Sequence, residues 1–155
     1  MTDTYDSTAD TLRHSQRVGE LIGQAVKELV DRSTFHDRSK TESPELETFN
    51  EFAPKLQDST YGSPEYRAFL DEMGEALAHH YANNRHHPEH FPDGGVRGMT
   101  LVDLIEMLAD WKAATERHND GSLTRSLPIQ RDRFDIGPDL HQVLVNTAEW
   151  FGWLT

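Results

Sequence analysis

The sequence predicts an all-α protein, a single domain over residues 1–155 built as a bundle of about five to seven helices. Apolar residues recur at spacings of three and four along most of the chain, and no stretch alternates in the way of a β-strand. The length suits one domain with a core of its own. Because cysteine is absent, disulfides and thiolate metal sites are excluded.

The first predicted helix covers residues 8–32 and is amphipathic. Its apolar positions are Leu12, Val18, Leu21, Ile22, Ala25, Val26 and Leu29. His14 falls on this stripe and is therefore expected to point inward. A histidine on an apolar face is often a packed core residue, so a ligand role for His14 depends on partners elsewhere in the chain.

Two Ser-Pro-Glu runs, at 43–45 and 63–65, predict helix starts. Each offers a capping hydroxyl, a proline at the first helical position and an acid in the first turn. The second helix is expected to continue to about residue 81. Prolines and glycines over 83–98 predict a loop.

Thr100 is expected to cap an apolar helix over 101–118, which a break at 119–121 ends. Shorter helices are expected over 127–134 and 138–153. The predicted domain therefore has a core region of about 10–118, followed by C-terminal helices within 124–153.

The charge balance restricts the partners. With 15 basic and 27 acidic residues the formal net charge is −12, which disfavours a nucleic-acid groove. No apolar run approaches the roughly 18 residues of a membrane span, and the polar N-terminus is unlike a signal peptide. We therefore expect a cytoplasmic protein, with a homodimer left open. A small phosphorylated substrate is compatible with the acidic surface, because a metal site would supply its own local positive charge.

The adjacent pair His36-Asp37 is the starting point for a functional hypothesis. One imidazole nitrogen and one carboxylate oxygen suit a divalent cation such as Mn, Fe, Zn, Mg or Co. Farther along the chain, Asp110 lies mid-helix among apolar neighbours, where a carboxylate is costly unless it is paired or binds metal. Asp110 is therefore a predicted ligand, and Asp103 or Glu106 a predicted partner that orients a ligating histidine.

Five histidines crowd residues 79–90. Neighbours on a helix diverge by about 100°, so His79 and His80 cannot both face one ion. His80 continues the apolar stripe of its helix and is the better candidate. His86, His87 and His90 are either solvated loop residues or ligands of a second ion.

Cationic residues near these positions are candidates for binding phosphate. Lys40 follows Asp37 by three residues, and Arg85 and Lys112 are further candidates. Lys40, Asp37 and Asp103 are the predicted catalytic residues.

Taken together, His14, His36-Asp37 and Ala-Asp110-Trp-Lys-Ala resemble the HD-domain superfamily of all-helical, metal-dependent phosphohydrolases. The resemblance covers about residues 10–118 and implies that His14, His36, Asp37 and Asp110 bind metal. It also implies two ions where extra histidines intervene, here His80 and His87 or their neighbours.

The run His36-Asp-Arg-Ser-Lys40 is similar to the His-Asp-x-Gly-Lys run of two-metal cyclic-dinucleotide phosphodiesterases, although the Gly-Tyr-Pro motif of that group is absent. The His-His-Pro-Glu-His run at 86–90 resembles a small family of uncharacterised phage and bacterial proteins. The expected function is hydrolysis of a nucleotide or cyclic-nucleotide-like phosphoester, in the host cytoplasm if a phage encodes the protein.

Three alternatives stay open. Some HD-like proteins bind two irons and activate oxygen, and the histidine surplus would permit this. A module that keeps the fold but only binds a ligand or protein is the non-enzymatic alternative. A structural protein whose histidines merely pack is the third.

Overall fold

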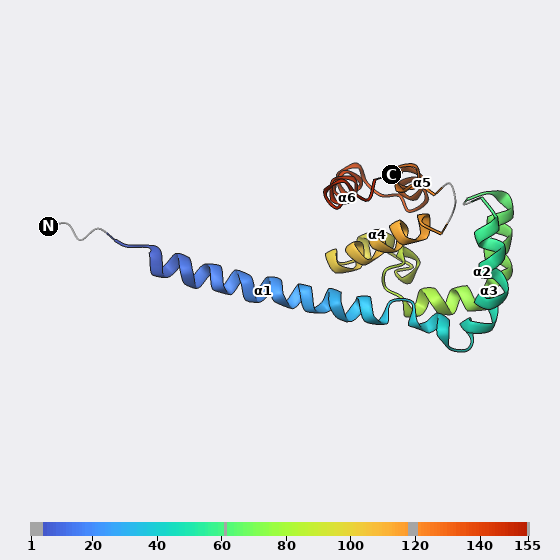
Figure 1. Ribbon diagram of the computed structural model, residues 1–155, viewed down its shortest axis with the longest axis horizontal. Helices are drawn as coiled ribbons and strands as arrows, with labels where there is room; N and C mark the ends of the chain where they lie inside the picture. The colour runs from blue at the N-terminus through green and yellow to red at the C-terminus, as the bar shows by residue number, and fades with distance from the viewer. Residues whose placement is uncertain (1–4, 61, 118–120, 155) are drawn as a thin grey trace. The chain divides into compact units, whose positions relative to one another are not determined.

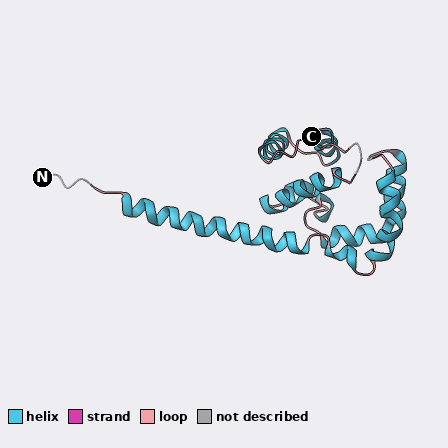
Figure 2. Cartoon of the chain, in the orientation of Figure 1, coloured by secondary structure: helices cyan, strands magenta, loops and turns pink. Residues whose placement is uncertain are grey.

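The computed structural model describes residues 5–60, 62–117 and 121–154. Across these residues it is helical and contains no strand (Figure 2), which confirms the predicted all-α class. Its elements, in chain order, are α1 Thr8–Phe35, η1 Arg38–Thr41, α2 Glu45–Asp58, α3 Pro64–Asn83, η2 Pro88–His90, η3 Gly95–Gly98, α4 Leu101–Thr115, α5 Leu123–Arg133 and α6 Pro138–Trp150 (Figure 1). Among the described residues, no helix combines the length and apolar character that a membrane crossing requires.

The chain divides into two compact units, Met1–Phe35 and His36–Thr155. In the first unit, α1 is the long amphipathic helix that the apolar spacing predicted, and it ends three residues later than expected. No residue of α1 is buried, and His14 is exposed on it. The second unit contains every other helix.

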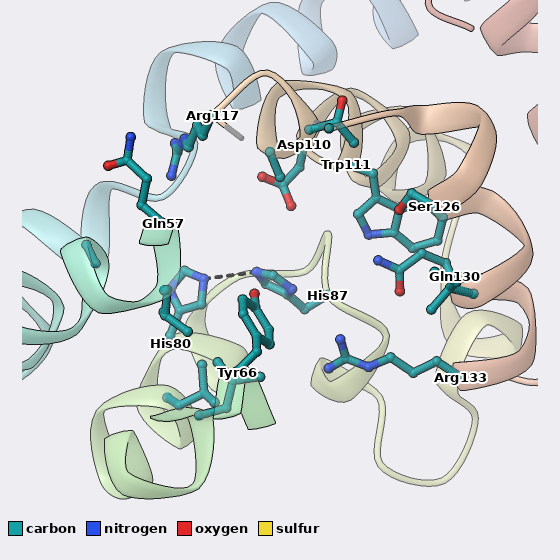
Figure 3. Close-up of a pocket in the computed structure, with 18 of the residues that line it drawn as sticks. Gln57, Tyr66, His80, His87, Asp110, Trp111, Arg117, Ser126, Gln130 and Arg133 are labelled. Atoms are coloured by element: carbon teal, nitrogen blue, oxygen red, sulfur yellow. Dashed lines mark hydrogen bonds between the residues drawn. The ribbon is translucent and has the colours of Figure 1, made fainter. Parts of the chain in front are cut away.

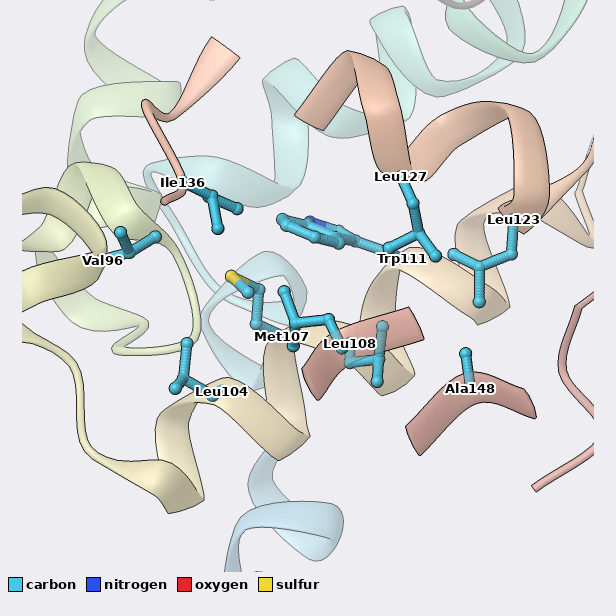
Figure 4. Close-up of a cluster of buried hydrophobic side chains, with 10 residues drawn as sticks. Val96, Leu104, Met107, Leu108, Trp111, Leu123, Leu127, Ile136 and Ala148 are labelled. Carbon is cyan, nitrogen blue, oxygen red and sulfur yellow. The ribbon is translucent and has the colours of Figure 1, made fainter. Parts of the chain in front are cut away.

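The core of the second unit is built around α4 (Figure 4). Side chains from α5, α6 and η3 pack on one face of this helix, and Met107 and Leu108 at its centre are almost fully buried. The buried cluster consists of Val96, Leu104, Met107, Leu108, Trp111, Leu123, Leu127, Ile136, Leu144 and Ala148. The C-terminal helices therefore hold α4 in place while another face of α4 remains available for polar residues.

Side-chain caps explain the starts of α3, α4 and α5. Thr100 accepts a hydrogen bond from the backbone of Asp103, whose carboxylate accepts one in return from the Thr100 backbone, so α4 begins with a capping box. Ser63 caps α3 as predicted. The predicted Ser43 cap is wrong: Pro44 holds the N-cap position of α2, without a side-chain hydrogen bond.

Several helix boundaries differ from the sequence prediction, among them the ends of α4 at Thr115 and of α6 at Trp150, each three residues before the expected end. The predicted start of the fifth helix at residue 127 is four residues late, because the Ser122 hydroxyl accepts from the backbone of Arg125 and lets α5 begin at Leu123. The helix α3 bends at Gly74, whose φ of 43° and ψ of −112° are not helical. Glycine adopts such angles at little cost. The predicted break at residues 119 and 120 lies outside the described residues.

Candidate metal centre

The pair His36-Asp37 opens the second unit, directly before η1. Asp37 has a left-handed backbone, with φ 54° and ψ 18°, and stands at the N-cap position of η1. Aspartate tolerates this conformation better than most residues, but it is still unusual for a residue with a side chain. The turn brings Asp37 Oδ1 within 3.4 Å of His80 Nε2 and 3.3 Å of His86 Nε2.

Two overlapping groups of side chains could each hold a metal ion. The His80 group comprises Asp37, His80, His86 and His87, and the His36 group comprises His36, Asp37, His86 and Asp110. Within each group the potential ligand atoms all lie within 4.8 Å of one another. Because Asp37 and His86 belong to both groups, the two candidate sites are adjacent.

The buried carboxylate of Glu45 and the half-buried carboxylate of Glu106 orient imidazoles of the two groups. Glu45, which has no exposed surface, accepts from His80 Nδ1 at 2.9 Å. Glu106 lies 2.9 Å from His36 Nδ1 and 3.3 Å from His86 Nδ1. A proton on each Nδ1 leaves Nε2 with its lone pair toward the cluster, the arrangement typical of metal-binding histidines.

Two buried polar atoms at the centre of the cluster are placed where a cation could bind them. Among the described residues, Asp37 Oδ1 and His86 Nε2 are both buried without a hydrogen-bond partner. Leaving such atoms unsatisfied costs about 1–3 kcal/mol each, whereas a cation between a carboxylate oxygen and an imidazole lone pair would satisfy both. The Nε2 atoms of His80 and His87 also face each other at 2.9 Å. The donor set and the geometry therefore fit a divalent metal.

The histidines of the two groups differ in their affinity for protons. Hydrogen bonding to Asp110, and then to Glu106, raises the pKa of His36 to about 10 despite its burial. Burial, and then the charges of His86 and His80, lower the pKa of His87 to about 3. The His80 group therefore presents a neutral imidazole at neutral pH, while His36 retains a proton that a metal ion would displace.

The two carboxylates of the groups both have lowered pKa values. Burial alone would raise the pKa of Asp37, but His86 and Lys40 lower it well below its usual range. For Asp110, too, burial acts to raise the pKa, but the hydrogen bond to His36 together with the charges of His86 and His87 lowers it overall. Both carboxylates are thus charged at neutral pH, as metal ligands must be.

Lys40 links the metal-ligand groups to a pocket. Its ammonium donates to Asp37 Oδ2 at 2.5 Å and lies over the ring of Phe49 at 4.9 Å. The pocket has a volume of about 650 Å³, and Lys40, His80, His87 and Asp110 line it. Figure 3 shows His80, His87 and Asp110 directed into this space. A ligand in the pocket would therefore reach both the lysine and the metal ligands.

Three predicted site residues have other partners. Asp103 is fully buried and accepts from Thr100 in the capping box and from Arg85 at 3.2 Å. Lys112 pairs with Glu116 at 3.3 Å. None of Asp103, Arg85 and Lys112 lies among the pocket or metal-ligand residues.

The predicted histidines differ in whether they belong to the metal-ligand groups. His80 is buried in its group as its stripe predicted, whereas His79 is about 42 % exposed and contacts Glu45 at 2.7 Å. His90 donates from Nδ1 to the backbone carbonyl of Tyr81 and belongs to neither group. Both groups consist of residues of the second unit, whereas His14 belongs to the first.

Sequence reasoning left His86 open as an alternative ligand and missed the contribution of Glu45. His86 belongs to both groups, whereas its neighbour His87 belongs to the His80 group alone. The divergence of neighbours on a helix does not apply here, because both follow the end of α3. Glu45 was interpreted only as an acid in a first turn. Its position on one stripe with Phe49 and Phe52 was the available signal of burial.

Comparison with known proteins places the chain in a family. A family model described as "Family of unknown function (DUF5662)" matches residues 3–150. The chain belongs to this family. No curated protein and no solved structure matched the chain. No HD-domain model matched either, so for this DUF5662 member the likeness to that superfamily stays a prediction.

Proposed function

We propose that this protein is a metal-dependent phosphohydrolase that acts on a small, nucleotide-like phosphoester. The observation that carries the proposal is that two metal-ligand groups share Asp37, which also accepts a hydrogen bond from Lys40. Lys40 lines a pocket beside both groups. The donors are histidine nitrogens and carboxylate oxygens, which suit Mn, Fe, Co or Zn better than Mg. When bound, such ions supply Lewis acidity and make water a nucleophile near neutral pH.

The chain's own residues would position the substrate and balance its charge. Lys40, which lines the pocket, would contact a phosphoryl oxygen and offset the negative charge that develops during hydrolysis. Glu45 and Glu106 would keep the imidazoles in the orientation that binding requires. The apolar residues of α2 and α3 that line the pocket would exclude water from one side of the substrate.

Metal analysis followed by a turnover screen tests the proposal. The purified protein should contain one or two equivalents of a transition metal by plasma mass spectrometry. Mn²⁺ should support hydrolysis of at least one nucleotide or cyclic nucleotide, and a chelator should abolish it. A protein that binds no metal, or one whose turnover is insensitive to chelator, contradicts the proposal. Metal binding without any turnover would favour a ligand-binding module.

One observation supports a second candidate, an oxygen-activating di-iron protein. The His80 group supplies three imidazoles and one carboxylate, a nitrogen-rich set that iron accepts readily. Lys40 beside the shared aspartate favours phosphate chemistry instead. Anaerobic loading with Fe²⁺ followed by exposure to oxygen separates the two, since a rapid change in visible absorbance would favour the oxygenase.

A further inference from the structure

The pocket reverses the charge balance of the protein. The whole chain has 15 basic and 27 acidic residues. The pocket lining instead has four basic residues, Lys40, Arg117, Arg125 and Arg133, against two acidic ones, Glu89 and Asp110. A protein that is acidic elsewhere but basic around one pocket attracts anions to that pocket.

Two walls of the pocket have different chemistry. The wall from α2 and α3 is mainly apolar and includes Phe49, Leu70 and Met73. The opposite wall is a face of α5, and its lining residues follow helical spacing. They are Ser122, Arg125, Ser126, Ile129, Gln130 and Arg133. A helix face that lines a pocket with five polar residues out of six is suited to a polar part of a ligand.

One arginine of this face is held in place by its neighbours. Glu89 accepts from Arg133 Nη2 at 2.8 Å, and the Arg133 guanidinium lies over the ring of Phe134 at 4.7 Å. Figure 3 shows Arg133 on the α5 side of the pocket, with His87 and Asp110 also lining the space. A guanidinium that is already ordered loses less entropy when it binds an anion, and its planar fork matches phosphate or carboxylate.

We propose that the pocket binds an organic phosphate that has a second anionic group, and that Arg125 and Arg133 of α5 bind this second group. The inference rests on the proposed function, because the first phosphoryl group would occupy the site of Lys40 and the metal ligands. Those residues come from η1, α3, α4 and the loop after α3, whereas the two arginines belong to α5. The two arginines would therefore contact a different part of the ligand from the metal-ligand residues.

Non-hydrolysable phosphonates test the inference by calorimetry on the Mn²⁺-loaded protein. The probes are propylphosphonate and the α,ω-alkanediphosphonates from ethylene to hexamethylene, whose lengths sample the unknown spacing. The best diphosphonate should bind at least about tenfold more tightly than propylphosphonate, the scale of added charge-assisted hydrogen bonds. Arg125→Gln with Arg133→Gln should remove this advantage and leave propylphosphonate affinity unchanged.

Arg131 provides the matched control, because it lies on the same helix, pairs with Asp132 and does not line the pocket. Arg131→Gln should preserve the diphosphonate advantage. Loss of the Arg133 contacts could unfold the double variant, so the single Arg125→Gln variant provides a second test. It should reduce the affinity advantage of the diphosphonate over propylphosphonate. No diphosphonate advantage, or an advantage that survives without both arginines, overturns the inference.

The same titrations separate this inference from the proposed function. If propylphosphonate binds the metal-free protein as tightly as the loaded one, the metal site is not the phosphate site, and the proposed function fails. If its binding depends on metal but diphosphonates gain nothing, the proposed function stands and the second anion site alone is wrong.

Discussion

The His80 group and the His36 group share Asp37 and His86 but differ in their two other ligands. The His80 group adds two imidazoles, one of them fixed by the fully buried Glu45. The His36 group adds one imidazole and one carboxylate, beside Glu106. The first group therefore has three nitrogens and one oxygen, and the second has two of each.

This difference shows how one cluster of side chains can provide two candidate metal sites with different ligand types. Nitrogen-rich sets favour borderline ions such as Zn²⁺ or Fe²⁺, whereas added carboxylate improves the fit to harder ions such as Mn²⁺. His87 is neutral because burial lowers its pKa to about 3, and His36 is protonated because Asp110 and Glu106 raise its pKa to about 10. We therefore expect the two groups to bind metal with different preferences.

Loss of the shared aspartate should have the largest effect. Asp37→Ala removes a ligand from both groups, so we expect metal content to fall close to zero. Plasma mass spectrometry of the purified protein measures this. Asp71→Ala, an exposed position on α3, should retain the normal content. Full metal content in Asp37→Ala would show that neither group is a metal site.

Loss of an unshared histidine should affect one group only. His80→Gln and His36→Gln should each lose one ion, and the ion that remains should differ. We expect His36→Gln to prefer Zn²⁺ over Mn²⁺ more strongly than His80→Gln does. Competition titrations with the two ions measure the preference, with His90→Gln as the control because His90 belongs to neither group. Identical preferences in the two variants would remove the distinction between the groups.

Lys40 should affect turnover and leave metal content unchanged. Lys40→Met removes a cation that contacts the shared Asp37 without removing a ligand. We expect kcat to fall about a hundredfold, the usual cost of losing one group that stabilises developing charge. Lys55→Met is a matched control, since Lys55 lies over Phe52 on α2 and does not line the pocket. Unchanged turnover in Lys40→Met would place the phosphoryl group elsewhere.

Substitution of the orienting carboxylates, Glu45 and Glu106, should have the smallest effect on metal binding. The loss of affinity should differ between the two ions. Glu45→Gln should weaken the ion in the His80 group by about tenfold to a hundredfold. Glu106→Gln should weaken the ion in the His36 group by as much, with a smaller loss in the His80 group through the shared His86. Titration with a chromophoric chelator measures both affinities. Glu47→Gln, exposed in the same first turn of α2, should change neither. If both variants weaken both ions equally, the two groups act as one site.

The sequence predicted the helices and part of the centre because helical spacing assigns a residue to a face. His80 was chosen over His79 by this argument, and Asp110 was chosen as a carboxylate among apolar neighbours. Spacing fails beyond the end of a helix, which is why His86 was not assigned beside His87. His14 stays a prediction of the sequence, and the metal content of a His14→Gln protein tests it.

Sequence alone therefore determined the all-α class, the amphipathic helices and the pairing of a nitrogen and an oxygen donor at His36-Asp37. Tertiary structure decided which distant residues meet that pair. The left-handed turn at Asp37 and the loop after α3 bring the two groups together, and Glu45 joins them from another helix. The reason is physical: local spacing fixes the direction of a side chain within one helix, whereas the packing of helices and the path of loops fix its neighbours.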